Sequence, residues 1–205
     1  MYGNPDGTTY AEIHGNNVSS NIKNIIDEWY SNNIRYTEFD KYVSYTAGFC
    51  GDRSLYSGDG ISSNKNTCFS ANDRLLKLSA TFKCQNINND LYTTSVSKFG
   101  NKALTYPVAL ITADELVYSG VDLNHLNKKS WSYSSTHYWT MTPSDYFAQQ
   151  TSSHIIFFST VGYLNPWNYA ELILDVRPVI NLKSDVKISG GIGTSNDPFI
   201  IDTNN

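Results

Sequence analysis

The sequence predicts an α+β fold: a mostly antiparallel sheet with two or three short helices and long loops. Three observations predict it. A segment near the N-terminus has the apolar periodicity of an amphipathic helix, the second half holds short apolar runs separated by turn residues, and a polar stretch between them has no periodicity. We expect a single globular domain over residues 1–205, since no internal repeat or long linker divides the chain.

The clearest helix is expected from about Ser20 to Asn32, capped by Ser19 or Ser20. Its apolar residues recur at helical spacing on one face and are Ile22, Ile25, Ile26, Trp29 and Tyr30. The opposite face is expected to carry Lys23, Asn24, Asp27 and Glu28. One side of this helix should therefore pack on the core.

The stretch from Tyr42 to Asn72 is predicted to be irregular, because glycines and a Ser-Asn cluster interrupt it. So long an irregular stretch usually needs a constraint. Cys50 lies inside it and Cys84 lies beyond it.

A short apolar run, Pro107 to Ile111, predicts a buried strand. Thr112 and Glu115 then form the Thr-x-x-Glu pattern of a capping box, so a short helix should run to about Tyr118 and stop at Gly120. The chain is thus expected to pass directly from strand to helix.

The second half is predicted to form a sheet. Its expected strands are His137 to Thr142, His154 to Thr160, Leu172 to Leu182 and Pro198 to Asp202. The glycines of Gly190 to Gly193 follow a strand but open no helix, so they are interpreted as a hairpin turn rather than a phosphate loop.

Composition excludes two classes of partner. The net charge is −4 and no basic run occurs, so we expect binding neither to nucleic acid nor to a membrane surface. No stretch approaches the roughly 18 apolar residues of a membrane span. Residues 1–5 have no features of an export signal, so an exported protein would correspond to an excised portion of a longer chain.

The three cysteines allow one disulfide and one free thiol in three pairings, or three reduced thiols. No Cys-x-x-Cys pair occurs, and the four histidines stand at no ligand spacing, so zinc is not expected. Asp52 and Asp59 resemble part of a calcium loop, yet Arg53 and Leu55 occupy ligand positions and no closing Glu follows. We favour an ion pair and turn glycines that hold this loop, with Arg53 in a structural role, and expect no metal or cofactor.

No local signature of catalysis is present, because the chain has no Gly-x-Ser-x-Gly elbow and no cysteine in a catalytic setting. We therefore expect no enzyme. Arg177 precedes Pro178 in an apolar segment, so it is expected to be extended, partly buried and a structural anchor rather than a ligand contact.

Seven segments together resemble a family of uncharacterised extracellular domains of Gram-positive gut-type bacteria, often found behind a prepilin-like or other membrane-anchored N-terminus. They are Gly48–Cys50, Asp52–Ser54, Thr81–Cys84, Gly100–Pro107, Leu110–Glu115, Tyr138–Pro143 and Val176–Lys183. The tail also resembles the end of the C-type-lectin-like fold shared with formylglycine-generating enzymes and with retroelement-diversified binding proteins.

The resemblance implies an extracellular, cell-surface location, a C-type-lectin-like fold and a disulfide between Cys50 and Cys84, with Cys68 left over. It disfavours a formylglycine-generating activity, since no cysteine follows Cys84. A binding or adhesion domain for an unknown protein or glycan is the expected function. A structural pilin-like subunit, which would contact copies of itself, is the alternative.

The ligand is expected at turns between the Trp139 strand and the Arg177 strand, because aromatic residues in turns tend to be exposed. The candidate residues are Tyr146, Phe147, Tyr163, Trp167, Asn168 and Tyr169. The competing interpretation is that Phe147 and Trp167 fold back over the core. If the lectin-like resemblance holds, these segments lie on the face that such folds use for ligands.

Overall fold

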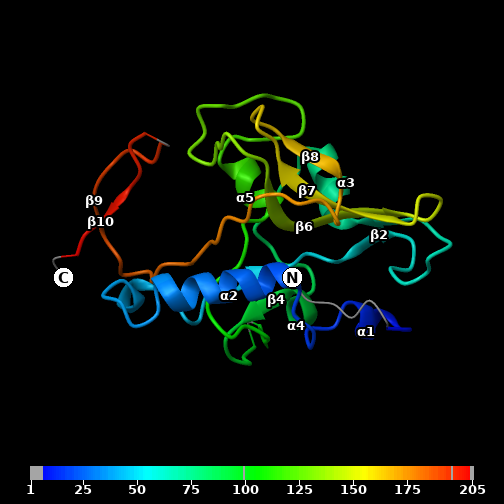
Figure 1. Cartoon of the computed structure of the whole chain (residues 1–205), viewed down its shortest axis with the longest axis horizontal. Coiled ribbons are helices and arrows are strands. Elements are labelled where there is room, and N and C mark those ends of the chain that lie inside the picture. Colours follow the sequence, from blue (N-terminus) through cyan, green and yellow to red (C-terminus); the bar gives the residue numbers. More distant parts are fainter. Residues whose placement is uncertain (1–6, 99, 195, 204–205) are drawn as a thin grey trace.

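A computed structural model describes residues 7–98, 100–194 and 196–203, and its architecture is the predicted α+β mixture (Figure 1). Residues 1–5, on which the expectation about an export signal rests, lie outside this part. The helices are α1 (Tyr10–Ile13), α2 (Asn21–Asn33), the 3-10 turn η1 (Asp40–Tyr42), α3 (Ser70–Leu76), α4 (Ile87–Asp90) and α5 (Ala113–Tyr118). The strands are β1 (Phe49–Cys50), β2 (Leu55–Ser57), β3 (Thr67–Phe69), β4 (Leu91–Thr93), β5 (Asn101–Lys102), β6 (Tyr138–Phe147), β7 (Ser152–Phe158), β8 (Leu164–Tyr169), β9 (Ile188–Gly190) and β10 (Ile200–Ile201).

The main sheet has five antiparallel strands in the order β2-β3-β6-β7-β8. A small three-stranded sheet, β1-β4-β5, and the β9–β10 pair complete the strands described. In Figure 1, α2 runs below the main sheet and α5 lies on its other side.

Two apolar cores cover the two faces of the main sheet at one end. Trp139 of β6 and Phe157 of β7 pack in the core that includes α2. Their neighbours Tyr138 and Phe158 pack in the core that includes α3 and α5. Because successive side chains of a strand point to opposite faces, this end of β6 and β7 is buried on both sides. The other end of the two strands extends beyond these cores.

The helix α2 lies within one residue of the predicted bounds, but two residues of its buried face differ from the prediction. Ser20 is the N-cap and accepts a hydrogen bond from the Lys23 backbone nitrogen. Lys23, predicted on the solvent side, is fully buried with Ile26 and Tyr30, whereas Ile25 is 53% exposed. The prediction was wrong for Lys23 and Ile25, because the ion pair between Lys23 and Asp27 neutralises the buried ammonium. It is confirmed for the rest of the face, since Ile22 and Trp29 also pack against the core.

The segments expected at positions 107–111 and 172–182 are not strands. Ala109 pairs with Val179 through one isolated bridge, although residues 107–111 are buried as predicted. The segment 172–182 touches three partners in turn, and Pro178 has no N–H to donate to a ladder. An extended apolar segment therefore makes single bridges instead of a strand.

The ligand residues were expected in turns at 144–147 and 162–169, but 144–147 and 164–169 are strands. Pro143 lies in β6 between two register irregularities, and Pro166 lies in β8 at the edge of the sheet. Edges and bulges are the places where a sheet tolerates proline. The prolines that suggested turns therefore mark a bulge in β6 and the edge strand β8.

Other predicted elements are confirmed. Thr112 and Glu115 form the complete capping box of α5, and Gly120 follows the helix with φ +87°. Strands β6 and β7 contain most of the segments predicted from His137 to Thr142 and from His154 to Thr160. Gly191 opens the connection between β9 and β10 with φ +80°. A Cβ at Gly191 would lie 1.9 Å from the Pro198 carbonyl oxygen, so glycine is required there.

The irregular stretch 42–72 contains β1, β2 and β3, and a disulfide anchors it. Cys50 and Cys84 are bonded, with their Cα atoms 5.6 Å apart, and Cys68 is free. The pairing implied by the resemblance is therefore confirmed. In the described part of the chain, no helix has the length and apolar character needed to cross a membrane.

Candidate functional site

Four rings gather where β6, β7 and β8 extend beyond the cores. We call Phe147, His154, Trp167 and Tyr169 the aromatic patch. The register places His154 directly opposite Tyr169, and His154 also contacts Phe147 and Trp167. The ring centroids lie 5.1 Å apart for His154 and Tyr169 and 6.1 Å apart for Phe147 and Trp167. Three strands thus assemble one continuous aromatic surface.

The outer strand supplies the exposed part of the aromatic patch. Trp167 is 56% exposed and Tyr169 is 41% exposed, and they stand two residues apart on β8. Residues two apart in a strand share a face, so both rings stand on the same side of the edge strand. Such rings offer a large contact area with few rotatable bonds.

A buried histidine–aspartate hydrogen bond lies beneath the exposed rings. The His154 imidazole is 5% exposed, and its Nδ1 donates to Asp145 Oδ1 over 2.5 Å. The hydroxyl of buried Ser144 donates to the other oxygen, Asp145 Oδ2, over 2.8 Å. Both carboxylate oxygens are therefore occupied, and the imidazole is fixed in position. Ser144 contacts the carboxylate and not the imidazole, so these three residues do not have the order of a nucleophile, base and acid.

The structure brings together Phe147, Trp167 and Tyr169 of the predicted ligand residues and separates the other three. Tyr146 lines a hollow of about 490 Å³ beside α1, which His154 also lines, and its hydroxyl donates to the Ser63 carbonyl oxygen. Asn168 lies between Trp167 and Tyr169 on β8 and so points to the opposite face. Tyr163 precedes the far end of β8, about 20 Å of strand from Tyr169.

His154 and Asp145 were not predicted as parts of this site. They lie nine residues apart in the chain and meet only because β6 and β7 pair in a register that sets them side by side. The available signal was their position near predicted strands, which does not determine register.

Arg53 lies in the interior. It is 6% exposed, its Nε donates to Asp90 Oδ1 over 2.8 Å, and its guanidinium stacks on the Tyr92 ring. Further hydrogen bonds join it to the side chain of Asn16 and the carbonyl of Asn89. These contacts connect the loop after β1 to α4 and β4.

Arg177 is half-buried and has a different environment. Its Nη1 donates to the Ser132 carbonyl oxygen over 2.8 Å, and its guanidinium carbon lies 4.7 Å from the centre of the Tyr138 ring. Burial raises the pKa of Tyr138 to about 12, against a smaller opposing effect of the nearby Arg177 charge. No carboxylate pairs with Arg177 in the described part of the chain.

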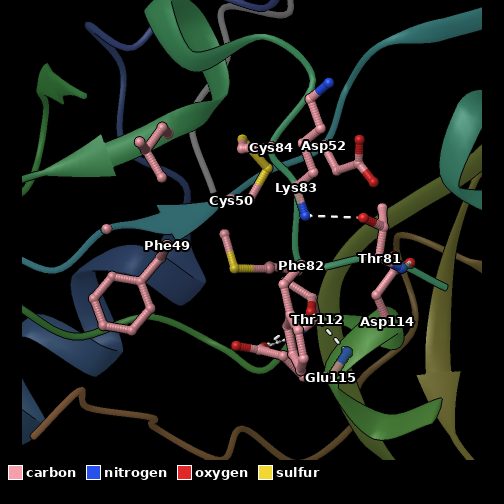
Figure 2. A pocket seen from close by; sticks show the side chains of 13 residues that line it. Phe49, Cys50, Asp52, Thr81, Phe82, Lys83, Cys84, Thr112, Asp114 and Glu115 are labelled. Atoms are coloured by element: carbon pink, nitrogen blue, oxygen red, sulfur yellow. Dashed lines mark hydrogen bonds between the residues drawn. A yellow bond between two sulfur atoms is a disulfide. The ribbon is translucent and has the colours of Figure 1, made fainter. Parts of the chain in front are cut away.

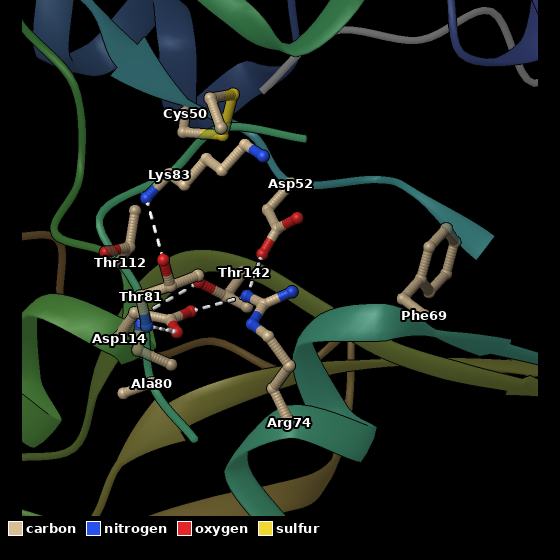
Figure 3. Close-up of polar contacts among 12 residues, drawn as sticks. Cys50, Asp52, Phe69, Arg74, Ala80, Thr81, Lys83, Thr112, Asp114 and Thr142 are labelled. Carbon is tan, nitrogen blue, oxygen red and sulfur yellow. Dashed lines mark hydrogen bonds and ion pairs between the residues drawn. A yellow bond between two sulfur atoms is a disulfide. The ribbon is translucent and has the colours of Figure 1, made fainter. Parts of the chain in front are cut away.

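A second polar group lies inside the protein, and we call Asp52, Arg74 and Asp114 the charge centre (Figure 3). Arg74 Nη2 on α3 donates to both carboxylates, at 2.9 Å to Asp114 Oδ2 and at short range to Asp52. Asp114 also accepts from the Thr81 backbone nitrogen, and Asp52 has φ +47°. The charge centre therefore ties three segments together: the loop after β1, α3 and the start of α5.

A small pocket of about 100 Å³ adjoins the charge centre and the disulfide (Figure 2). Asp52 and Asp114 line this pocket, and Asp52 Oδ1 is buried without a protein partner. A volume of this size holds a few water molecules, which can donate to this oxygen. Burial raises the pKa of Asp52, and the Arg74 charge opposes the effect.

The calcium alternative has no support in the geometry. Asp52 engages Arg74, whereas Asp59 accepts hydrogen bonds from Ser62 and Ile61 in its own turn. Residues 7–98, 100–194 and 196–203 contain no group of three His, Cys, Asp or Glu side chains arranged to hold a metal.

Comparison with protein-family models, with curated proteins and with solved structures finds no match for this chain. The resemblances stated from the sequence, including the lectin-like one, therefore stay predictions.

Proposed function

We propose that this protein is a non-catalytic binding domain that works outside the cytoplasm and attaches to a surface ligand, a protein or a glycan, through the aromatic patch. One observation carries the proposal: two large exposed rings, Trp167 and Tyr169, stand side by side on an edge strand above a fixed His154–Asp145 pair.

The rigidity of the aromatic patch supports binding. Phe147 and His154 contact the exposed rings from two neighbouring strands, so the surface is formed before a ligand arrives. A preformed surface loses little conformational entropy on association. Exposed Tyr and Trp are also the residue types enriched where binding energy concentrates.

The disulfide supports the compartment. Bonds such as Cys50–Cys84 persist in oxidising environments and are rare in the cytoplasm. An oxidising location outside the cytoplasm follows from it, and display at the cell surface is the finer proposal.

The test is a pair of arrays, one of glycans and one of extracellular matrix proteins, probed with the wild-type chain and with Trp167→Thr, Tyr169→Thr. Threonine retains strand propensity while it removes both rings. Tyr56→Thr is the matched control, because Tyr56 lies on β2 at the other edge of the same sheet and is 59% exposed.

We expect the wild type and the Tyr56→Thr control to bind the same spots, and the double variant to lose at least tenfold in affinity. Absence of wild-type binding on both arrays, or equal binding by the double variant, would overturn the proposal. Assembly of the wild type at high concentration that the double variant loses would assign the aromatic patch to contacts between copies, as in a pilin-like subunit.

A further inference from the structure

A second set of exposed rings lines a hollow elsewhere on the molecule. We call this hollow, of about 700 Å³, the Trp131 groove; it lies between Trp131 and Tyr133 on one side and the connection of β9 and β10 on the other. Figure 1 shows the β9–β10 hairpin on the opposite side of the molecule from the tip of the β6–β7 hairpin. The groove therefore uses different elements from the aromatic patch.

The rings of the Trp131 groove are open to solvent. Trp131 is 48% exposed and Phe199 is 60% exposed. Trp131 also borders an adjoining hollow of about 340 Å³, where Phe82 and Tyr118 stack with centroids 4.1 Å apart. Contiguous exposed apolar surface of this kind marks interaction sites, whereas single exposed rings do not.

Arg177 gives the Trp131 groove its charge. Arg177 lines the groove, and one of the five N–H donors of its guanidinium is occupied by the Ser132 carbonyl. The Tyr138 ring supports it from one side. Contact with Ser132 and Tyr138 holds the guanidinium in place and leaves its remaining donors without a carboxylate in the described part of the chain.

Two of the four arginines pair with carboxylates, whereas Arg35, like Arg177, lies over tyrosine rings. Arg53 is paired with Asp90, and Arg74 is paired with both Asp52 and Asp114. The chain has 19 acidic residues against 15 basic ones, so carboxylates are in excess. A half-buried guanidinium that lacks one, in a hollow, is complementary to a carboxylate from outside the chain.

We infer that the Trp131 groove binds a carboxylate-bearing sugar of an acidic glycan. Arg177 would receive the carboxylate through two N–H donors, and Trp131 and Phe199 would pack on the C–H faces of the sugar rings. A hollow of this volume matches those that hold small ligands. This site goes beyond the proposed function and does not depend on the aromatic patch.

A peptide is the less suitable occupant. Peptides that bind in extended form add to an exposed strand edge. The lining residues Trp131, Tyr133, Thr194 and Phe199 all lie outside strands, so the groove offers side chains and no ladder.

The test is calorimetric titration of the full chain with sialyllactose and with trigalacturonate, each compared with its methyl ester. Esterification removes the charge and keeps the ring faces. We expect one of the two acids to bind at least tenfold more tightly than its ester. Arg177→Gln should remove this preference, and Arg177→Lys should restore part of it, because an ammonium retains the charge without the planar fork.

Two further variants keep the test interpretable if Arg177→Gln is poorly folded. Trp131→Ala and Phe199→Ala remove exposed rings, so each should stay folded and should weaken binding of the acid at least threefold. Arg35→Gln is the matched control, since Arg35 also stacks on tyrosine rings but lies outside the groove. It should bind the acid as the wild type does, as should Trp167→Thr, Tyr169→Thr.

Several results would overturn the inference. The first is that neither acid binds, and the second is that acid and ester bind equally. The third is that Trp131→Ala and Phe199→Ala bind the acid with wild-type affinity. The fourth is that a peptide with a free C-terminal carboxylate binds and the sugars do not. Loss of acid binding in Trp167→Thr, Tyr169→Thr alone would move the sugar to the aromatic patch and would also overturn it.

Discussion

The charge centre holds charged side chains in the interior, whereas the aromatic patch holds large aromatic side chains in solvent. Arg74, Asp52 and Asp114 carry charge into the interior, and each finds its partner within the protein. Trp167 and Tyr169 leave apolar surface in solvent and find only part of their contacts within the protein. The charge centre therefore stabilises the fold, and the exposed rings remain available to a ligand.

The largest effect is expected from Arg74→Met. It leaves two buried carboxylates without a cation, and removal of one partner from a buried ion pair costs about 3 to 5 kcal/mol. The loss should be smaller near pH 4, because burial raises the pKa of Asp52 and favours its uptake of a proton. Urea unfolding at pH 7 and pH 4 measures both values.

Lys77→Met is the matched control for Arg74→Met. Lys77 follows the same helix and also pairs with a carboxylate, that of Asp73, but its side chain is 62% exposed. An exposed pair contributes about 0 to 1 kcal/mol. Equal losses in the two variants would contradict the structural role of the charge centre.

Loss of the disulfide should come next. The Cys50–Cys84 bridge spans 34 residues of sequence, and closing such a loop stabilises the folded state by about 3 to 4 kcal/mol in the loop-entropy model. Cys50→Ser, Cys84→Ser should lower the free energy of unfolding by this amount, whereas Cys68→Ser should leave it nearly unchanged. A thiol assay on the unfolded, unreduced wild type should detect Cys68 alone. Reaction of all three cysteines would show that the Cys50–Cys84 disulfide is absent.

Alkaline pH tests a buried hydroxyl near Arg177. The pKa of Tyr138 is raised to about 12 in the folded protein because the ring is buried, against an ordinary value of 10.0. Folding therefore favours the protonated form, so its contribution is complete below pH 10 and is lost as pH rises toward 12. The two-unit difference corresponds to at most about 2 to 3 kcal/mol.

Tyr138→Phe should therefore flatten the fall in stability between pH 10 and pH 12, as measured by unfolding at each pH. An unchanged slope would show that Tyr138 is ionised as easily in the folded chain as in the unfolded one.

Local signals predicted the elements that local contacts form. The capping box of Thr112 and Glu115 and the cap at Ser20 each lie within four residues, and both are present. The charge centre could not be predicted from the sequence, because Arg74 lies 22 residues from Asp52 and 40 residues from Asp114. Only the packing of α3 against the loop after β1 and α5 brings them together.

The candidate site shows the same limit. Composition singled out Phe147, Trp167 and Tyr169 as aromatic residues near turn formers, but Pro166 suggested a turn where the sheet has an edge strand. Which rings share a face depends on strand register, and register also brought in His154. Tyr163 and Asn168 had the same composition signal and lie elsewhere.

A small loss of stability, and the largest loss of binding, is expected from Trp167→Thr, Tyr169→Thr. Each ring is about half exposed, so its removal should cost about 1 kcal/mol, well below the cost of Arg74→Met.

The free energy of unfolding of this double variant, measured on the same samples as its affinity for the array ligand, tests the separation of fold and function most directly. The account predicts a loss of about 2 kcal/mol or less together with at least a tenfold loss of affinity. A loss as large as that of Arg74→Met with affinity retained would assign Trp167 and Tyr169 to the core and would contradict it.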